Sequence, residues 1–290
     1  MTGDAGQGAA ARATTAARAG PPVYDRIGRG YAAHRIADPR WQAAIAAAVG
    51  DAATVANVGA GAGSYEPARR TTVAVEPSSQ MIGQRPAGAA SAVRGVAEAL
   101  PLRDGAADVG LAVLTTHHWH DPATGLRELR RVSRRQVVVT WDPAVAARFW
   151  LVTDYLPEIR DHDERLAPLA VVRAGLAPAA VTPLPVPRDC SDGVLAAYWA
   201  RPEAYLDPGV RGSISGLALL PAAVVGRAMG RLAADLASGA WHARHGHLLD
   251  RPDLDLGYRV VVSERPRLNP RAWAPPARPS CAGSPAGRAP

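Results

Sequence analysis

Residues 54–67, TVANVGAGAGSYEP, hold the most informative pattern in the chain. They begin as a short apolar run and continue as a loop with glycine at positions 59, 61 and 63. Glycine allows the backbone to turn sharply and to approach a ligand at the mouth of a strand. We therefore expect a buried strand that leads into a ligand-binding loop.

The first half of the chain alternates between strand and helix patterns on both sides of this loop. Apolar strands are predicted at 54–59, 71–76, 91–95, 107–114 and 136–141. Helices are predicted at 40–50, closed by Gly50, and after the N-cap pair Asp121-Pro122. A further helix is expected after the glycine loop, with a late start because of Pro67. Short apolar strands between helices predict a parallel sheet that is covered on both faces.

The second half predicts a strand at 179–187, a helical stretch over 190–249 and a last strand at 256–264. A late hairpin around a helical insertion would place that insertion over the carboxyl edge of the sheet, where ligands of such sheets bind. The predicted fold class is α/β, a Rossmann-like doubly wound sheet of seven mostly parallel strands with a helical lid. The predicted organisation is a disordered leader at 1–20, one domain at 21–263 with its lid at about 190–250, and a disordered tail at 264–290.

The charge distribution argues against a nucleic-acid partner. The formal net charge is +7, of which residues 1–20 supply +1 and residues 264–290 supply +4, so that 21–263 keeps only +2. A nucleic-acid-binding domain is expected to carry a basic face of its own. All 33 basic residues are arginine, which together with the excess of alanine is typical of a GC-rich, actinobacterial genome.

Compartment and membrane signals are also weak. The two cysteines, Cys190 and Cys281, form neither a disulfide framework nor a zinc pattern, so a reducing cytoplasmic setting is expected. The longest apolar run, 217–226, is too short to span a bilayer and contains Pro221. We expect no membrane partner, and a monomer or a homodimer.

The residues around the loop narrow the choice of ligand. A dinucleotide fingerprint needs a glycine at position 64, where this chain has Ser64, and a phosphate-binding P-loop needs a lysine, which the chain lacks. Glu76 ends the second strand, where a carboxylate can accept hydrogen bonds from both hydroxyls of a ribose. The loop alone is also compatible with a simple tight turn, but together with Glu76 it indicates nucleoside binding.

Five segments then occur in a characteristic order: VGAGAGSYEP, VAVEPS, GVAEALPL, DVGLAVLTTHHWHD and LRRVSRRQVVVTWDP. This ordered set resembles the class I S-adenosylmethionine-dependent methyltransferases, in the branch that includes quinone-type and other small-molecule enzymes. The resemblance is close over residues 22–143 and loose beyond them. It implies S-adenosylmethionine as the cofactor and a small molecule as the methyl acceptor. The cysteine and histidine spacings predict no metal site.

The resemblance implies a cofactor site at the glycine loop, at the end of the second strand, beside the adenine-flanking segment and at the end of the fourth strand. The residues concerned are Gly59, Ala60, Gly61, Gly63, Glu76, Pro77, Ala97, Glu98 and Leu114. Many relatives carry an aspartate where this chain has Val96, so adenine would depend on backbone groups or on Glu98. The cofactor has no phosphate, and its carboxylate is expected near the amides of a helix N-terminus.

His117 and His118 follow the fourth strand, beside the position of the methyl donor in that family. A hydroxyl acceptor benefits from a base, so these are the candidate catalytic residues, with His118 ahead; packing or capping roles remain open. O-methylation is slightly favoured, within specialised metabolism. Further residues that could line the substrate site are Tyr24, Tyr31, Arg35, Trp119 and Tyr198.

Several alternatives remain open. Asp189 and Asp192 are expected to cap a helix that begins near Gly193 rather than to act in catalysis. His242, His245 and His247 lack a carboxylate at ligand spacing and are expected to form a polar helix end. The rival functions are a nicotinamide-dependent oxidoreductase and a non-catalytic binding protein that keeps the fold, the latter favoured by Val96.

Overall fold

A seven-stranded sheet forms the centre of the molecule in the computed structural model, which describes residues 24–25, 31–67, 70–166 and 168–264. The strand order is β3-β2-β1-β4-β5-β9-β6. The strands are β1 (Thr54–Val58), β2 (Thr71–Glu76), β3 (Ser91–Arg94), β4 (Ala107–Val113), β5 (Ser133–Trp141), β6 (Ala180–Pro183) and β9 (Tyr258–Glu264). The first five are parallel, and β9 runs antiparallel to both β5 and β6. The predicted fold class is confirmed, including the late hairpin.

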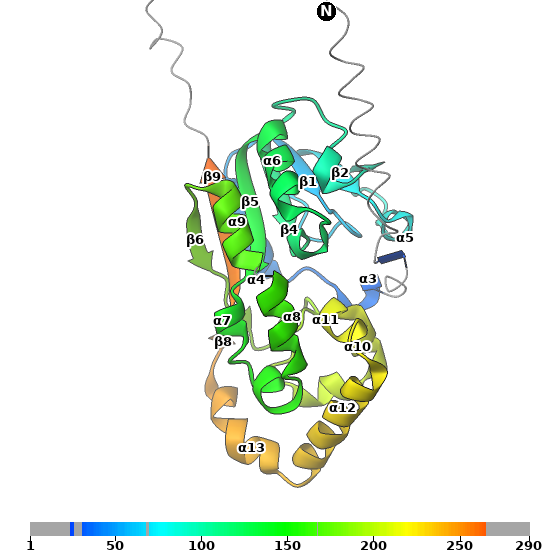
Figure 1. Ribbon diagram of the computed structural model, residues 1–290, viewed down its shortest axis with the longest axis vertical. Helices are drawn as coiled ribbons and strands as arrows, with labels where there is room; N and C mark the ends of the chain where they lie inside the picture. The colour runs from blue at the N-terminus through cyan, green and yellow to red at the C-terminus, as the bar shows by residue number, and fades with distance from the viewer. Residues whose placement is uncertain (1–23, 26–30, 68–69, 167, 265–290) are drawn as a thin grey trace, which may run out of the picture.

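Helices cover both faces of this sheet because its central strands are apolar on both sides. On one face α4 (Pro39–Val49) packs with Trp41, Ile45 and Val49 against the valines of β1, β4 and β5. On the other face, toward the viewer in Figure 1, α6 (Pro122–Val132) and α9 (Pro168–Leu176) bury leucines and valines. The predicted caps hold: Gly50 ends α4 with φ 69°, and the Asp121 carboxylate accepts from Thr124 N at 3.1 Å.

A second group of helices lies beyond the carboxyl end of the sheet, in the lower half of Figure 1. One part follows β5 directly: α7 (Pro143–Ala146), the π-helical turn η3 (Leu151–Tyr155) and α8 (Glu158–Leu166). The other part contains η4 (Pro202–Leu206), α10 (Pro208–Ser213), α11 (Ser215–Ala218), α12 (Ala222–Ala237), α13 (Ala240–His245) and η5 (Gly246–Asp250). A two-stranded ribbon of β7 (Val186–Pro187) and β8 (Asp253–Leu254) joins this layer to the sheet. Residues 143–166 thus add to the helices predicted within 190–250.

The expected helix after the glycine loop does not form in the described residues. Residues 59–67 make turns, and β2 begins at Thr71. Pro67 lacks an amide hydrogen, and the Glu66 carboxylate before it accepts from Asn57 Nδ2 at 3.2 Å, Arg85 Nη2 at 2.5 Å and Ala90 N at 3.1 Å. These contacts fix the chain in a non-helical path. The loop is followed only later by a single helical turn, α5 (Ser79–Ile82), after β2.

The predicted helix near Gly193 is also wrong, and so are the capping roles of Asp189 and Asp192. Residues 195–200 form turns, and the following helices begin at Pro202 and Pro208. Asp192 is 1% exposed and forms an ion pair with Arg35, with Nε–Oδ1 at 2.5 Å. Both oxygens of this buried carboxylate accept from Arg35, and Oδ2 also accepts from the Tyr65 hydroxyl, so that in the described residues neither oxygen caps a helix.

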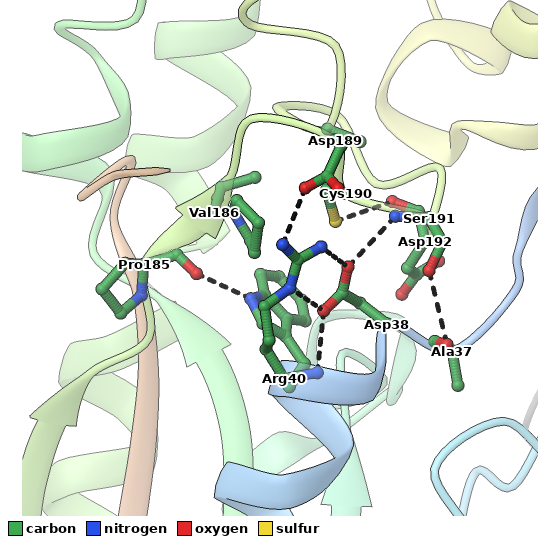
Figure 2. A network of polar contacts seen from close by, with 12 residues as sticks. Ala37, Asp38, Arg40, Pro185, Val186, Asp189, Cys190, Ser191 and Asp192 are labelled. Atoms are coloured by element: carbon green, nitrogen blue, oxygen red, sulfur yellow. Dashed lines mark hydrogen bonds and ion pairs between the residues drawn. The ribbon is translucent and has the colours of Figure 1, made fainter. Parts of the chain in front are cut away.

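A polar network joins the segment 189–192 to the start of α4, as Figure 2 shows. The buried carboxylate of Asp38 caps α4 by accepting from Arg40 N at 2.9 Å, and it also accepts from Ser191 N at 3.2 Å. Arg40 Nη1 reaches on to Asp189 at 2.7 Å. The N-terminal part of the domain and the segment leading into the helical layer are therefore held together by charge-assisted hydrogen bonds.

Within the part of the chain that the structure describes, no helix has both the length and the apolar character that crossing a bilayer requires. The predicted leader at 1–20 and nearly all of the predicted tail at 264–290 lie outside the described residues.

Candidate active site

A cavity of about 620 Å³, here the glycine-loop cavity, opens at the carboxyl ends of β1, β2 and β4. Most of the residues assigned to the cofactor line it. They are Gly59, Ala60, Gly61, Glu76, Pro77, Ala97, Glu98 and Leu114. Gly63 does not line it; its position faces Arg85 and Glu66 instead. The sheet edge thus brings together segments that are about sixty residues apart in the sequence.

The glycine loop has the geometry of a close backbone approach. A Cβ on Gly59 would lie 2.0 Å from Thr115 Oγ1, and Gly59 has φ 66°. Gly61 has φ 54°, but a Cβ there would find only Met81 Cε, at 3.4 Å. Gly59 is therefore fixed by the protein's own packing, whereas the space at Gly61 belongs to whatever fills the cavity.

Glu76 is tied to the loop that it faces. Its Oε2 accepts from Gly61 N at 2.8 Å and its Oε1 accepts from Ser78 N at 2.9 Å. The side chain is 5% exposed, and burial raises the pKa of its carboxyl above the ordinary value. Each oxygen keeps a lone pair for a further donor. A pair of adjacent hydroxyls, as on a ribose, matches this arrangement.

The segment expected beside adenine contains few free acceptors. Ala97 and Glu98 form the short helix η1 (Ala97–Ala99), and Glu98 Oε1 accepts from Asp121 N at 3.0 Å. Val96 lines the cavity with an apolar side chain. Glu98 therefore helps to hold the start of α6 in place.

The missing helix after the loop changes the expected anion binding. We expected the N-terminus of that helix to bind the cofactor's carboxylate. The same N-terminus could bind the pyrophosphate of a dinucleotide. Neither interaction has its helix in the described residues. The described residues fit a nucleoside with adjacent hydroxyls, and directly after the glycine loop they contain no helix N-terminus for either a carboxylate or a pyrophosphate.

His117 and His118 stack with ring centroids 3.7 Å apart on the short helix η2 (Thr116–His118). His118 Nε2 lies 3.2 Å from Tyr24 Oη. Burial and the nearby Arg35 charge lower the pKa of His118 to about 4, and burial lowers the pKa of His117 well below its ordinary value. Both rings are therefore in the unprotonated form at physiological pH, which is the form that a base requires.

Tyr24, Tyr31 and Arg35 lie together beside this histidine pair. The tyrosine rings meet edge to face at 5.2 Å, and Arg35 Nη1 donates to Tyr31 Oη at 2.7 Å. All three line the glycine-loop cavity. Tyr24 and Arg35 also line the neighbouring cavity described below, so these three residues lie where a substrate site was predicted. Residues 26–30, between them, lie outside the described part of the chain.

A second cavity of about 260 Å³, here the lid cavity, lies between the sheet edge and the helical layer. Four residues line both cavities: Tyr24, Arg35, Leu114 and His118. His117 lines the lid cavity only. Much of the remaining wall is apolar and comes from segments far apart in the chain, with Phe149, Ile159, Val194, Ile214, Leu219 and Leu256 as examples.

Five polar side chains of the lid cavity were not predicted from the sequence: Trp141, His162, Asp163, Ser215 and Tyr258. Trp141 Nε1 donates to Asp163 Oδ2 at 3.0 Å. A usable signal was present, because Ile159, Asp163 and Leu166 follow the spacing of one helix face and put an acid among apolar residues.

The other two residues predicted to line the substrate site, Trp119 and Tyr198, lie in different surroundings. Trp119 lines the glycine-loop cavity and also packs on α6, where a Cβ at Gly125 would lie 2.3 Å from its ring. Tyr198 lines neither cavity. Its ring packs against Tyr205 at 5.5 Å and beneath Arg201 at 5.0 Å.

The histidine cluster near the end of the helical layer behaves as a polar helix end. His245 Nε2 lies 2.8 Å from Asp154 Oδ2. No group of histidine, cysteine or acidic side chains in the described residues has the arrangement of a metal site.

Comparison with known proteins supports a common ancestry with methyl-transferring enzymes. The family model for a methyltransferase domain matches residues 56–139. A crystal structure from Anabaena variabilis, described as a methyltransferase candidate from an antibiotic biosynthesis pathway, is 31% identical, with a TM-score of 0.74, over 80% of this chain and 99% of its own. A SAM-dependent methyltransferase from Thermotoga maritima is 21% identical, with a TM-score of 0.44, over 56% of this chain and 83% of its own. No curated protein matches the chain.

Proposed function

Because the chain belongs to the class I S-adenosylmethionine-dependent methyltransferases, we propose that it methylates a small molecule, with a hydroxyl oxygen as the favoured acceptor atom. The observation that carries this proposal is the pair of adjoining cavities. One is shaped by the glycine loop and Glu76, the other is mostly apolar, and Tyr24, Arg35, Leu114 and His118 belong to both.

The glycine-loop cavity is the place for the cofactor. Glu76 would accept from the ribose hydroxyls, and Ala97 and Val96 would pack beside the adenine. When bound, S-adenosylmethionine would supply a methyl group activated by its positively charged sulfur, which would leave as the neutral thioether of S-adenosylhomocysteine when an aligned nucleophile takes the methyl. Because the donor is already activated, the protein's contribution is mainly to hold the acceptor in line and to exclude water.

His118 is the proposed base for a hydroxyl acceptor. It lies where the two cavities meet, and its ring is neutral at physiological pH because of burial and the nearby arginine. Its Nε2 faces Tyr24 Oη, which can orient the ring or pass on the proton. His117 stacks against it from the lid cavity and fixes its position.

The size and composition of the lid cavity support a small acceptor. About 260 Å³ accommodates a compact, mostly apolar molecule. The nearly neutral charge of residues 21–263 remains an argument against a nucleic acid. The antibiotic-pathway description of the Anabaena relative supports a role in specialised metabolism. Membership of the quinone-type branch and an actinobacterial source stay predictions.

Thermal unfolding with S-adenosylhomocysteine tests the cofactor assignment, with NAD as the control. A ligand at about a hundredfold excess over its Kd stabilises a protein by about 2.7 kcal/mol. For a domain of this size the melting temperature rises by roughly 5–10 °C. A rise with NAD alone would contradict the proposal.

The non-catalytic alternative rests on Val96, which gives the adenine amino group no side-chain acceptor. The His118→Gln variant separates it from catalysis. We expect kcat for a hydroxyl acceptor to fall by about 10²- to 10⁴-fold, the usual contribution of a base, while the affinity for S-adenosylhomocysteine stays unchanged. Transfer that is undiminished in this variant would remove His118 from the reaction.

A further inference from the structure

The lid cavity contains one buried negative charge that the protein does not balance. Among the described residues, two charged side chains line this cavity, Arg35 and Asp163. Arg35 is matched by Asp192, with contacts at 2.5 and 3.3 Å. Asp163, on α8, is 9% exposed, and the structure shows no cation beside it in the described residues. The wall of the lid cavity therefore carries a net negative charge whenever Asp163 is ionised.

The hydrogen bond from Trp141 does not explain this carboxylate. Trp141 Nε1 is a neutral donor and uses only Oδ2. A neutral amide would accept the same bond without the cost of burying a charge. Within the part of the chain that the structure describes, nothing donates to Oδ1, so this oxygen is available to a molecule in the cavity.

The position of Asp163 relative to His118 gives the acceptor a direction. His118 marks the boundary with the glycine-loop cavity. From there a line of contacts runs through His117, at 3.7 Å, and Trp141, at 4.7 Å between ring centroids, to the carboxylate of Asp163. A molecule that reaches from His118 to Asp163 meets a proton acceptor at one end and a negative charge at the other.

We propose that the methyl acceptor is an apolar molecule that carries a basic nitrogen at a distance from its hydroxyl, and that Asp163 is the specificity-determining residue that binds this nitrogen as a cation. This inference rests on the proposed function, because it assigns the lid cavity to the acceptor. It adds a requirement that neither the family nor the cofactor site imposes.

The protonation states in the cavity agree with this assignment. Burial raises the pKa of Asp163 to about 6, so that its carboxyl is largely ionised at pH 7.5. Burial lowers the pKa values of His117, His118 and His162, the histidines that share the cavity, so these rings are neutral at pH 7.5. Arg35 remains charged and paired with Asp192. Selectivity for a cation should accordingly decline as the pH falls through about 6.

The test uses matched probes on the full chain saturated with S-adenosylhomocysteine. Isothermal titration compares 4-(aminoalkyl)phenols of increasing chain length with the corresponding 4-(hydroxyalkyl)phenols, which replace the ammonium by a hydroxyl. We expect at least one amine to bind about tenfold or more tightly than its alcohol at pH 7.5, as for a hydrogen bond to a charged group, and this preference to shrink at pH 5.

Two variants locate the effect. Asp163→Asn keeps the size of the side chain and should abolish the preference for the amine, whereas Asp161→Asn, an exposed acid on the same helix, should keep it. Equal binding of amines and alcohols by the wild-type protein would overturn the proposal, as would a preference that survives in Asp163→Asn. S-adenosylhomocysteine binding is measured in the same samples, and its absence in the wild-type protein would instead refute the proposed function.

Discussion

The two cavities meet at four residues, yet they are built in different ways. The glycine-loop cavity depends on backbone geometry at strand ends, with Gly59 against Thr115 and the Gly61 amide on Glu76. The lid cavity is framed by side chains from β5, α8, α11 and the segments around residues 195 and 256. A site built from backbone requires particular residues at fixed spacings, whereas a site built from side chains requires only that distant segments pack together.

A substitution in the glycine loop should show the stricter requirement of the first cavity. Gly61→Val places a branched side chain in the space that a ligand would fill, since only Met81 Cε lies near, at 3.4 Å. We expect the affinity for S-adenosylhomocysteine, measured by titration, to fall by more than about a hundredfold, because overlap with a well-packed ligand costs several kcal/mol.

Gly105→Val is the matched control for this change. Gly105 also has a positive φ, of 58°, and a Cβ on it would meet nothing within 4 Å. The variant should therefore lose comparable conformational stability while binding S-adenosylhomocysteine normally. Similar loss of binding in both variants would show that backbone strain, and not occupation of the site, is responsible.

The ion pair between Arg35 and Asp192, at the wall of the lid cavity, should contribute strongly to folding stability. Asp192→Ala leaves Arg35 buried without its partner and also removes the acceptor of the Tyr65 hydroxyl, at 2.9 Å. Breaking a buried pair in this way typically costs about 3–5 kcal/mol. Thermal unfolding should show a large drop in melting temperature, whereas Asp189→Ala, an exposed acid in the same segment, should leave it nearly unchanged. Equal effects of the two changes would contradict the burial argument.

Removing the charge of Asp163 should change stability in the opposite direction from removing that of Asp192. The pKa of Asp163 is about 6 in the folded protein and near 4 in the unfolded chain. The unfolded chain therefore ionises first, and the free energy of unfolding falls as the pH rises from about 4 to about 6. Without an acceptor, Asp163→Asn should therefore raise the free energy of unfolding at pH 7 by roughly 2–3 kcal/mol. Denaturant titrations should find this gain absent at pH 4, with Asp161→Asn neutral at both pH values. A destabilised Asp163→Asn protein at pH 7 would contradict the unbalanced-charge interpretation.

Prediction from the sequence succeeded where short-range rules apply. The strands, the caps at Gly50 and Asp121, and the positions of Gly59 and Glu76 follow from local patterns and from the rule that parallel strands end at one edge. The helix after the loop failed because Glu66 binds Arg85 and Ala90 instead of continuing a helix. The predicted capping role of Asp192 was wrong for a related reason. Its ion-pair partner Arg35 is 157 positions away in the sequence, and no local pattern indicates that contact.

The lid cavity as a whole could not be predicted for the same reason, because its wall depends on segments that meet only in the folded chain. Only one part of it had a local signal, the acid Asp163 among apolar residues on one face of a polar helix. Tyr198, predicted to line the substrate site, packs on Tyr205 outside both cavities, a contact that no local pattern indicates.

The contact between Arg35 and Asp192 also bears on the order in which the molecule assembles. Closing a loop of 157 residues carries a larger entropic cost than forming the neighbouring strand pairs of the sheet. Because this cost comes before the contact is made, we expect the contact to form after the parallel strand pairs β1–β2, β2–β3 and β4–β5, whose partners are closer in the sequence. The parallel part of the sheet with its glycine loop can thus form before the wall of the lid cavity is complete. In hydrogen exchange, the amide of Gly193, which donates to His34 O at 2.9 Å, should exchange before the amides of β4 and β5.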